Sequence, residues 1–120
     1  MLEVSDQSEP AHSVHRIGAV VALADESAEE YIRLHAQVPS EVLDALRRAN
    51  VTNYSIFRHE DLLFSYMEYR GSDLEADMAA VASNPATQRW WEMVKPMQRT
   101  MSSSPDEDWW TTMREVFYLA

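Results

Sequence analysis

Apolar residues cluster in short runs that predict strands. The run His15–Leu23 is rich in Ile, Val and Ala, which suits a strand buried on both faces. Residues 51–57 and Leu62–Tyr69 are dense in β-branched and aromatic side chains, and the polar break between them predicts an antiparallel hairpin. Residues 113–119 have the same character. The pattern therefore predicts four strands, the last of them over 113–119.

Between the first and second predicted strands, apolar side chains recur at helical spacing. Residues 26–38 carry them on one face, with acidic side chains in the first turn, where the helix dipole favours negative charge. Pro39 interrupts this pattern because proline cannot continue a helix interior. A second helix is therefore predicted from Ser40 to Asn50.

Another pair of helices is predicted after the hairpin. Ser72 and Glu75 match a capping box, and apolar residues at helical spacing follow them. Asn84 and Pro85 restart the helix, because an asparagine cap and a proline at the first helical position both favour a helix beginning. This helix is expected to end near Pro96, before a loop over 101–108.

The order of these elements predicts an α+β fold of the ferredoxin-like, split βαβ type. Such a fold has a four-stranded antiparallel sheet with its helices on one face. The other face must also be covered, and a second copy of the chain does so economically, which predicts a homodimer of the dimeric α+β barrel type. One such domain is expected over 14–120, preceded by a polar tail over 1–13 that lacks periodicity.

Charge and composition exclude several classes of partner. Ten basic and twenty acidic residues give a net charge of −10, which repels nucleic acid and anionic membrane surfaces. The first ten residues are polar, unlike a secretory signal, and the longest apolar run is too short to span a membrane. The chain has no cysteine, which fits a cytoplasmic protein. With only two glycines, no phosphate-binding loop is possible, so we expect no nucleotide cofactor.

Among the histidines, His35 is the candidate for acid/base chemistry near neutral pH. It lies four residues after Tyr31 on one helix face, so the two side chains can converge on one ligand. By pattern alone, a half-buried structural histidine fits this position as well. The spacing of His12 and His15 resembles half of a metal site, but no second pair of ligands accompanies it in the sequence. His59 falls in the predicted turn. We therefore expect no metal site.

Aromatic residues supply the candidates for ligand contact. Trp90 and Trp91 point about 100 degrees apart on their helix, so one indole can enter the core while the other lines a cleft. An indole face suits the C–H face of a sugar. Tyr54 either packs in the sheet or offers its hydroxyl to a ligand. Trp109 and Trp110 are candidates for a lid or for covering a dimer edge.

Five stretches of the chain form a specific pattern together, although each alone is weak. They are Glu30-Tyr31 with Leu34-His35, Asn53-Tyr54-Ser55-Ile56, Leu62-Leu63-Phe64, Gln88-Arg89-Trp90-Trp91, and Glu115-Val116-Phe117-Tyr118-Leu119. Across residues 16–119 this pattern resembles the L-rhamnose mutarotase family. The resemblance departs from the family near the site, where Pro39 and Ser40 stand in place of a tryptophan and a proline.

The resemblance implies a ferredoxin-like α+β dimer that interconverts the anomers of a 6-deoxy-L-sugar, L-rhamnose or L-fucose, without cofactor or metal. It implies that His35 is the proton donor and that Tyr31, Tyr54, Trp90 and Trp91 contact the sugar. The partner that completes the proton relay, whether Tyr31, a water or a carboxylate, stays open.

Two other functions remain compatible with the residues. The same dimeric scaffold could carry a cofactor-free oxygenase or another small-ligand enzyme, because this fold hosts many chemistries. A sugar-binding module without catalysis is the other alternative. An oxygenase would consume oxygen with an aromatic substrate, whereas a binding module would bind sugar and leave anomer exchange unchanged.

Overall fold

The computed structural model describes residues 14–101 and 108–120, and its elements follow the predicted order. They are β1 (His15–Leu23), η3 (Asp25–Ser27), α1 (Ala28–His35), α2 (Ser40–Arg48), β2 (Val51–His59), β3 (Leu62–Tyr69), α3 (Leu74–Ser83), α4 (Pro85–Val94), η4 (Lys95–Met97), β4 (Gln98–Arg99) and β5 (Thr111–Met113). The first and third predicted strands are confirmed at both ends. The expected tail over 1–13 lies outside the described residues.

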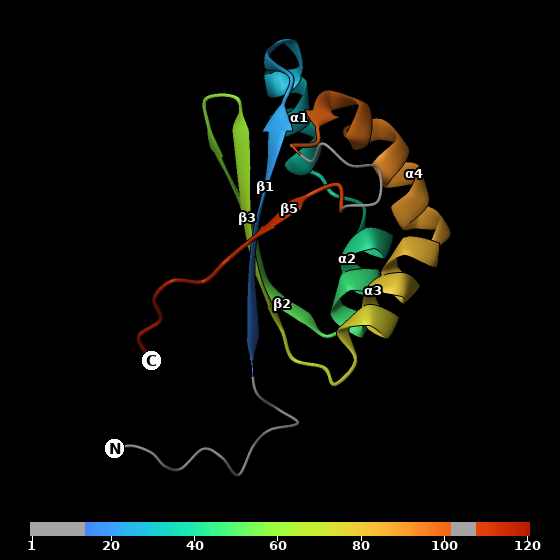
Figure 1. The fold of residues 1–120 in the computed structure, drawn as a ribbon. Coiled ribbons are helices and arrows are strands. Elements are labelled where there is room, and N and C mark those ends of the chain that lie inside the picture. Colours follow the sequence, from blue (N-terminus) through green and yellow to red (C-terminus); the bar gives the residue numbers. More distant parts are fainter. Residues whose placement is uncertain (1–13, 102–107) are drawn as a thin grey trace.

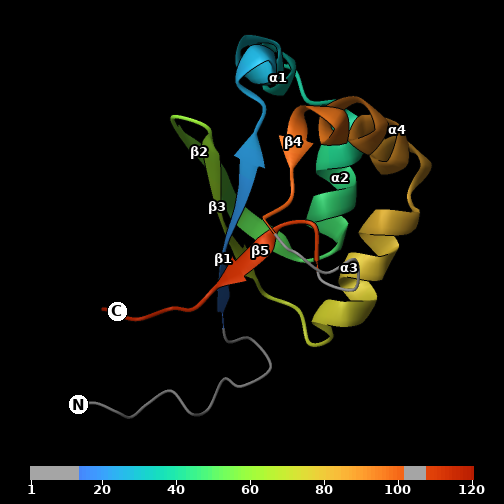
Figure 2. The ribbon, with the colours of Figure 1, turned by 45° about the horizontal axis from the view of Figure 1, so that its top comes forward.

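The sheet has the ferredoxin-like strand order. Its strands run β2-β3-β1-β4, and every pairing is antiparallel. β1 pairs with β3 along its length, from His15 opposite Tyr69 to Ala22 opposite Leu62. The described α-helices, α1 to α4, all lie on one side of this sheet (Figures 1 and 2). The predicted α+β class with helices on one face is therefore confirmed.

The closing strand differs from the prediction. β1 is paired on its outer edge by two short strands, β4 and β5, and β5 ends at Met113. Residues 114–120 have no regular structure, and the chain leaves the sheet on the side opposite the helices (Figure 1). The strand predicted over 113–119 is therefore wrong beyond Met113. A strand needs an edge to pair with, and after Met113 the backbone leaves the edge of β1, although the Glu115 carboxylate still contacts the Arg16 side chain of β1 at 3.0 Å.

Two helix starts show how local chemistry fixes the helix layer. Asn84 accepts hydrogen bonds from the N–H groups of Ala86 at 2.9 Å and Thr87 at 3.2 Å, which confirms the predicted cap of α4. The cap of α3 is Asp73, which accepts from the N–H of Ala76 at 3.1 Å. The capping box assigned to Ser72 is thus wrong by one residue, because an aspartate next to it is an equally good cap.

A bulge in β2 determines which face Tyr54 occupies. The register shifts between Thr52 and Ser55, where one extra residue enters the strand. Asn53 there has a φ of 48°, a left-handed conformation that asparagine tolerates better than most residues. Its amide donates a hydrogen bond to a Glu68 carboxylate oxygen at 2.8 Å. Strict alternation from the buried first residue of β2 would turn Tyr54 outward, whereas the bulge turns it toward the helices.

The core lies between the sheet and the helix layer. Val21 of β1 and Leu63 of β3 pack there against Trp90 and Val94 of α4. A second, smaller cluster joins Val51 of β2 to the helices α2 and α3. The space between these clusters is not filled by side chains, and it forms the cavity described next.

Candidate functional site

A cavity of about 470 Å³ lies between the sheet and the helices. Its volume is within the range of small-molecule sites, and most of its lining is apolar. The residues singled out from the sequence all line it: Tyr31, His35, Tyr54, Trp90 and Trp91. The structure thus brings together side chains from α1, β2 and α4.

His35 is held in one tautomer and one orientation by its own helix. Its Nδ1 lies 2.8 Å from the backbone carbonyl oxygen of Tyr31, and because that oxygen can only accept, Nδ1 carries the hydrogen. The imidazole stacks on the Tyr31 ring at 4.2 Å between centroids and meets the Trp90 ring edge-on at 5.0 Å. The remaining ring nitrogen, Nε2, makes no hydrogen bond within 14–101 and 108–120, so it can exchange a proton with a ligand.

The cavity favours the neutral form of His35. Burial lowers the pKa of His35 below its ordinary value of 6.5, and the hydrogen bond to the Tyr31 carbonyl only partly offsets this effect. Neutral imidazole with Nδ1 protonated has a lone pair on Nε2. At neutral pH the group is therefore poised to accept a proton first.

Tyr31 has a buried hydroxyl that belongs to a hydrogen-bond chain. Gln98 at the start of β4 is only 6% exposed, and its Nε2 donates to the Tyr31 hydroxyl oxygen at 2.9 Å. The Trp109 indole Nε1 in turn donates to Gln98 Oε1 at 2.7 Å. Burial raises the pKa of Tyr31 to about 12, and the Gln98 hydrogen bond acts in the opposite direction. The phenol is thus protonated throughout the physiological range.

Tyr54 presents its ring to the cavity from β2. It is 43% exposed, and desolvation nevertheless raises its pKa above 10.0. Both observations fit a side chain whose open surface faces the cavity instead of bulk water. The charge of an ionised Tyr54 would also raise the pKa of Tyr31, so the two phenols lie near each other.

The two tryptophans of α4 have different environments. Trp90 is 7% exposed and belongs to the core cluster, with one edge against His35. Trp91 is half-buried, and the Lys95 ammonium lies 4.6 Å from its ring centroid. Trp90 therefore supports the fold as well as the site, whereas Trp91 has more surface available to a ligand.

Three further polar or aromatic residues in this cavity escaped the sequence analysis or received no firm role. Gln98 gave no signal, since an isolated glutamine in a short segment has no pattern. Trp109, considered as a lid or a dimer edge, lines the cavity and contacts Gln98. The buried Thr87 hydroxyl lines it too, and it has no hydrogen-bond partner among the described residues. Threonine at this helix position carries no periodic signal that distinguishes it from core.

The other histidines lie elsewhere. His15 is exposed at the start of β1, and His59 is exposed at the end of β2, 3.9 Å from a Glu60 carboxylate oxygen. His12 lies outside the described residues. Within 14–101 and 108–120, no three His, Asp or Glu side chains converge as a metal site would require.

Comparison with known proteins gives consistent results. A family model described as L-rhamnose mutarotase matches residues 16–119. A protein named L-rhamnose mutarotase from Opitutus terrae is 41% identical over 93 residues, covering 75% of this chain and 84% of its own. One of the same name from Lactiplantibacillus plantarum is 33% identical over 106 residues, covering 87% of this chain and 97% of its own.

Two solved structures share the fold. The crystal structure of an L-rhamnose mutarotase from Formosa agariphila superposes with a TM-score of 0.70 at 23% identity, covering 88% of this chain and 99% of that chain. Tetracenomycin F2 cyclase from Streptomyces glaucescens, a polyketide cyclase, superposes with a TM-score of 0.64 at 20% identity, covering 88% and 96%. At these identities the structural likeness establishes the fold alone.

Proposed function

Because the chain belongs to the L-rhamnose mutarotase family, we propose that it exchanges the α and β anomers of a 6-deoxy-L-sugar in the cavity around His35. It is a sugar mutarotase, and therefore an isomerase. This location is supported by one observation, which is that a single cavity is lined by His35, Tyr31, Tyr54, Trp90 and Trp91. L-rhamnose, named for the relatives, is the first candidate substrate, and L-fucose is the second.

Mutarotation requires two proton movements. The anomeric hydroxyl O1 loses its proton while the ring oxygen O5 gains one, so that the bond from C1 to O5 breaks and C1=O1 forms. The aldehyde then rotates, and the ring closes on its other face by the reverse proton movements. A positioned acid/base pair is sufficient for this reaction.

His35 is the residue to which we assign the O1 proton. Its neutral form has an accepting Nε2, because Nδ1–H is bonded to the Tyr31 carbonyl. In ring opening Nε2 takes the proton from O1, and in ring closure the imidazolium returns it to the other face of the carbonyl. The proton-donor role implied by the family resemblance thus corresponds to the second half of the cycle.

The sugar contacts are assigned to aromatic side chains. The half-buried Trp91 can stack against the apolar C–H face and the methyl group of a deoxy sugar, and Tyr54 can hydrogen-bond a hydroxyl. Two charged residues, Lys95 and Asp108, are among the lining residues. An apolar lining with few polar groups suits an uncharged monosaccharide.

Anomer-exchange NMR with L-rhamnose and L-fucose tests this function. The exchange rate should exceed that in buffer for at least one of them. Because burial lowers the pKa of His35, the rate should persist to a lower pH than an ordinary histidine would allow, and it should fall in acid as Nε2 becomes protonated. No rate gain with either sugar, or with other monosaccharides, would refute the assignment.

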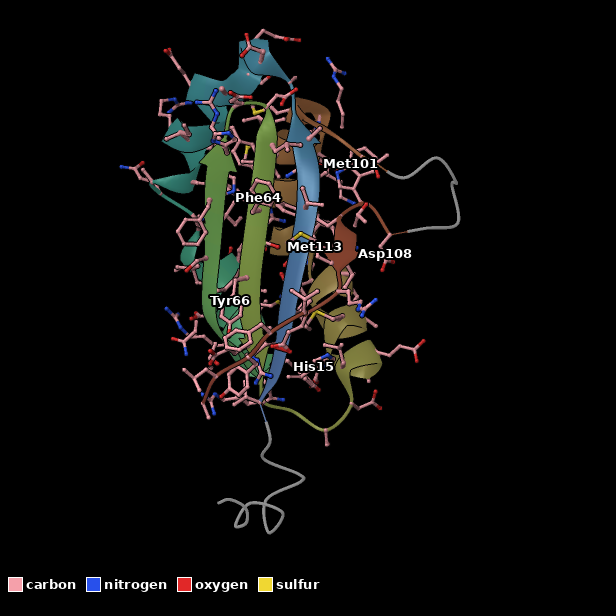
Figure 3. All side chains as sticks on the ribbon, turned by 60° about the vertical axis from the view of Figure 1, so that its left-hand side comes forward. His15, Phe64, Tyr66, Met101, Asp108 and Met113 are labelled. Atoms are coloured by element: carbon pink, nitrogen blue, oxygen red, sulfur yellow. The ribbon has the colours of Figure 1, made fainter. Side chains whose placement is uncertain are left out.

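We also propose that a second copy covers the outer face of the sheet. This face carries Phe64, Tyr66 and Met113, as Figure 3 shows. Beyond it, the segment 114–120 exposes large apolar side chains, with Phe117 78% exposed and Leu119 79% exposed. Apolar surface of this extent on a small domain is typical of an interface.

Sedimentation should therefore find a dimer at micromolar concentration. A Phe64→Glu variant, which adds charge to the outer face, should shift the protein toward monomer. Ile32→Glu is the matched control, since Ile32 is 51% exposed on α1 in the helix layer. A wild-type protein that sediments as a stable monomer would contradict the proposal.

The compartment that we propose is the cytoplasm. The absence of cysteine fits a reducing environment. Within the part of the chain that the structure describes, no helix is long and apolar enough to cross a membrane.

A further inference from the structure

The hydrogen bonds among Trp109, Gln98 and Tyr31 have only one possible direction. An indole N–H can only donate, so the Gln98 atom 2.7 Å from it must be the carbonyl oxygen Oε1. The amide nitrogen Nε2 then faces Tyr31, and an amide NH₂ group can only donate. The Tyr31 hydroxyl oxygen must therefore accept. Trp109 thus determines the orientation of the Gln98 amide, and Gln98 determines the polarity of the Tyr31 hydroxyl.

This polarity leaves the Tyr31 proton available. A phenol has one hydrogen to donate, and among the described residues no hydrogen bond is donated by the Tyr31 hydroxyl. Tyr31 is 3% exposed and lines the cavity beside His35, so its proton can reach a bound sugar more readily than bulk water. The hydroxyl is thus prepared to act as a donor before the sugar arrives.

Burial strengthens this arrangement. Successive hydrogen bonds that run in one direction polarise each other, and the low dielectric of the interior increases the effect. Here the direction is from the Trp109 N–H through the Gln98 amide to the Tyr31 hydroxyl. Gln98 cannot turn over without placing its NH₂ group against the indole N–H, which would leave two donors facing each other.

We infer that Gln98, oriented by Trp109, is a positioning residue that makes the Tyr31 hydroxyl the proton donor to the sugar ring oxygen. This inference rests on the proposed mutarotase function. In ring opening, His35 Nε2 takes the O1 proton, the O1–H electron pair forms C1=O1, and the C1–O5 pair passes to O5. O5 takes the Tyr31 proton, which is favourable because a phenol is a stronger acid than an alcohol. Ring closure returns both protons, so Tyr31 and His35 end as they began.

Gln98→Glu tests this inference, because a carboxylate accepts from both neighbours. Tyr31 would then donate its proton to residue 98 instead of the sugar. We expect kcat to fall roughly 100-fold at pH 8 with a much smaller change in KM. In a Tyr31→Phe background the same substitution should lower kcat no further, since the hydroxyl through which it acts is gone. A merely structural Gln98 would lower kcat by the same factor in both backgrounds, and that result would overturn the inference.

The variant should also recover in acid, relative to wild type. A protonated glutamate has one accepting oxygen and one donating O–H, so it reproduces the pattern of the amide. The ratio of variant to wild-type kcat should therefore rise as pH falls. Both proteins share the other titratable groups that line the cavity among the described residues, namely Tyr31, His35, Tyr54, Lys95 and Asp108. A ratio that is constant with pH would count against the inference.

Trp109→Phe provides a second variant that keeps Gln98 and adds no charge. It removes the N–H that orients the amide, so we expect a several-fold loss of kcat that also disappears in the Tyr31→Phe background. Trp110→Phe is the matched control, since Trp110 also lines the cavity and packs on the core. Equal losses for both tryptophans would contradict a specific role for Trp109. Wild-type activity separates the two proposals, because a protein without anomer exchange would refute the mutarotase function itself.

Discussion

Replacing His35 with glutamine should slow anomer exchange by about 100- to 10,000-fold while the protein remains folded. Glutamine can still form hydrogen bonds, but it cannot take up and release a proton near neutral pH. A positioned acid or base contributes an effect of this size. Anomer-exchange NMR measures the rate, and circular dichroism with urea unfolding measures the fold.

The structure predicts a modest cost in stability for this variant. His35 is half-buried, and its ring contacts are those with Tyr31 and Trp90. Loss of such contacts costs about 0.5–1.5 kcal/mol each. His59→Gln is the control, because His59 is exposed at the end of β2 and should be replaceable without effect on the rate. A His35→Gln protein that retains most of its exchange rate would shift the assignment to Tyr31 or to a carboxylate.

Replacing Trp90 with alanine should destabilise the protein by about 3–5 kcal/mol. Removal of a buried tryptophan leaves a cavity that the surrounding side chains fill only in part. Trp90 is 7% exposed and packs within the main core cluster. Since a domain of this size has about 5–15 kcal/mol of stability in total, the variant should unfold at a much lower urea concentration.

Trp91→Ala is the informative comparison for this variant. Trp91 is half-buried, and its ring is partly covered by Lys95 at 4.6 Å. Its replacement should cost less stability and should mainly weaken sugar binding, which NMR titration measures. Normal sugar affinity in a folded Trp91→Ala protein would exclude the stacking role. Similar early unfolding of both variants with normal binding would assign both indoles to the core.

Elements with a strong local signal were predictable from the sequence. The apolar run of β1, the caps and proline before α4, and the break at Pro39 depend on neighbouring residues alone. The position of the last strand was not predictable, because pairing depends on an edge that only the folded sheet provides. The apolar and aromatic run over 116–119 is the same whether its partner lies in this chain or in another.

The candidate site was predictable only in part. His35 and the aromatic residues belong to the stretches that resemble the L-rhamnose mutarotase family. The structure brings them around one cavity, while their roles stay predictions. Gln98 could not be found in this way. Its importance arises from contacts with Tyr31, 67 positions earlier in the chain, and with Trp109, 11 positions later. No local pattern joins residues at such separations.

Because of its bulge, β2 should tolerate the loss of a residue at one position better than at others. Loss of one residue from a regular strand inverts the facing of every side chain beyond it, because facing alternates with each residue. Within the bulge the extra residue is already outside the alternation, so its loss at Asn53 would leave Tyr54 directed at the cavity. Evolution and protein engineering therefore have one place in β2 where the strand can shorten without removing Tyr54 from the site.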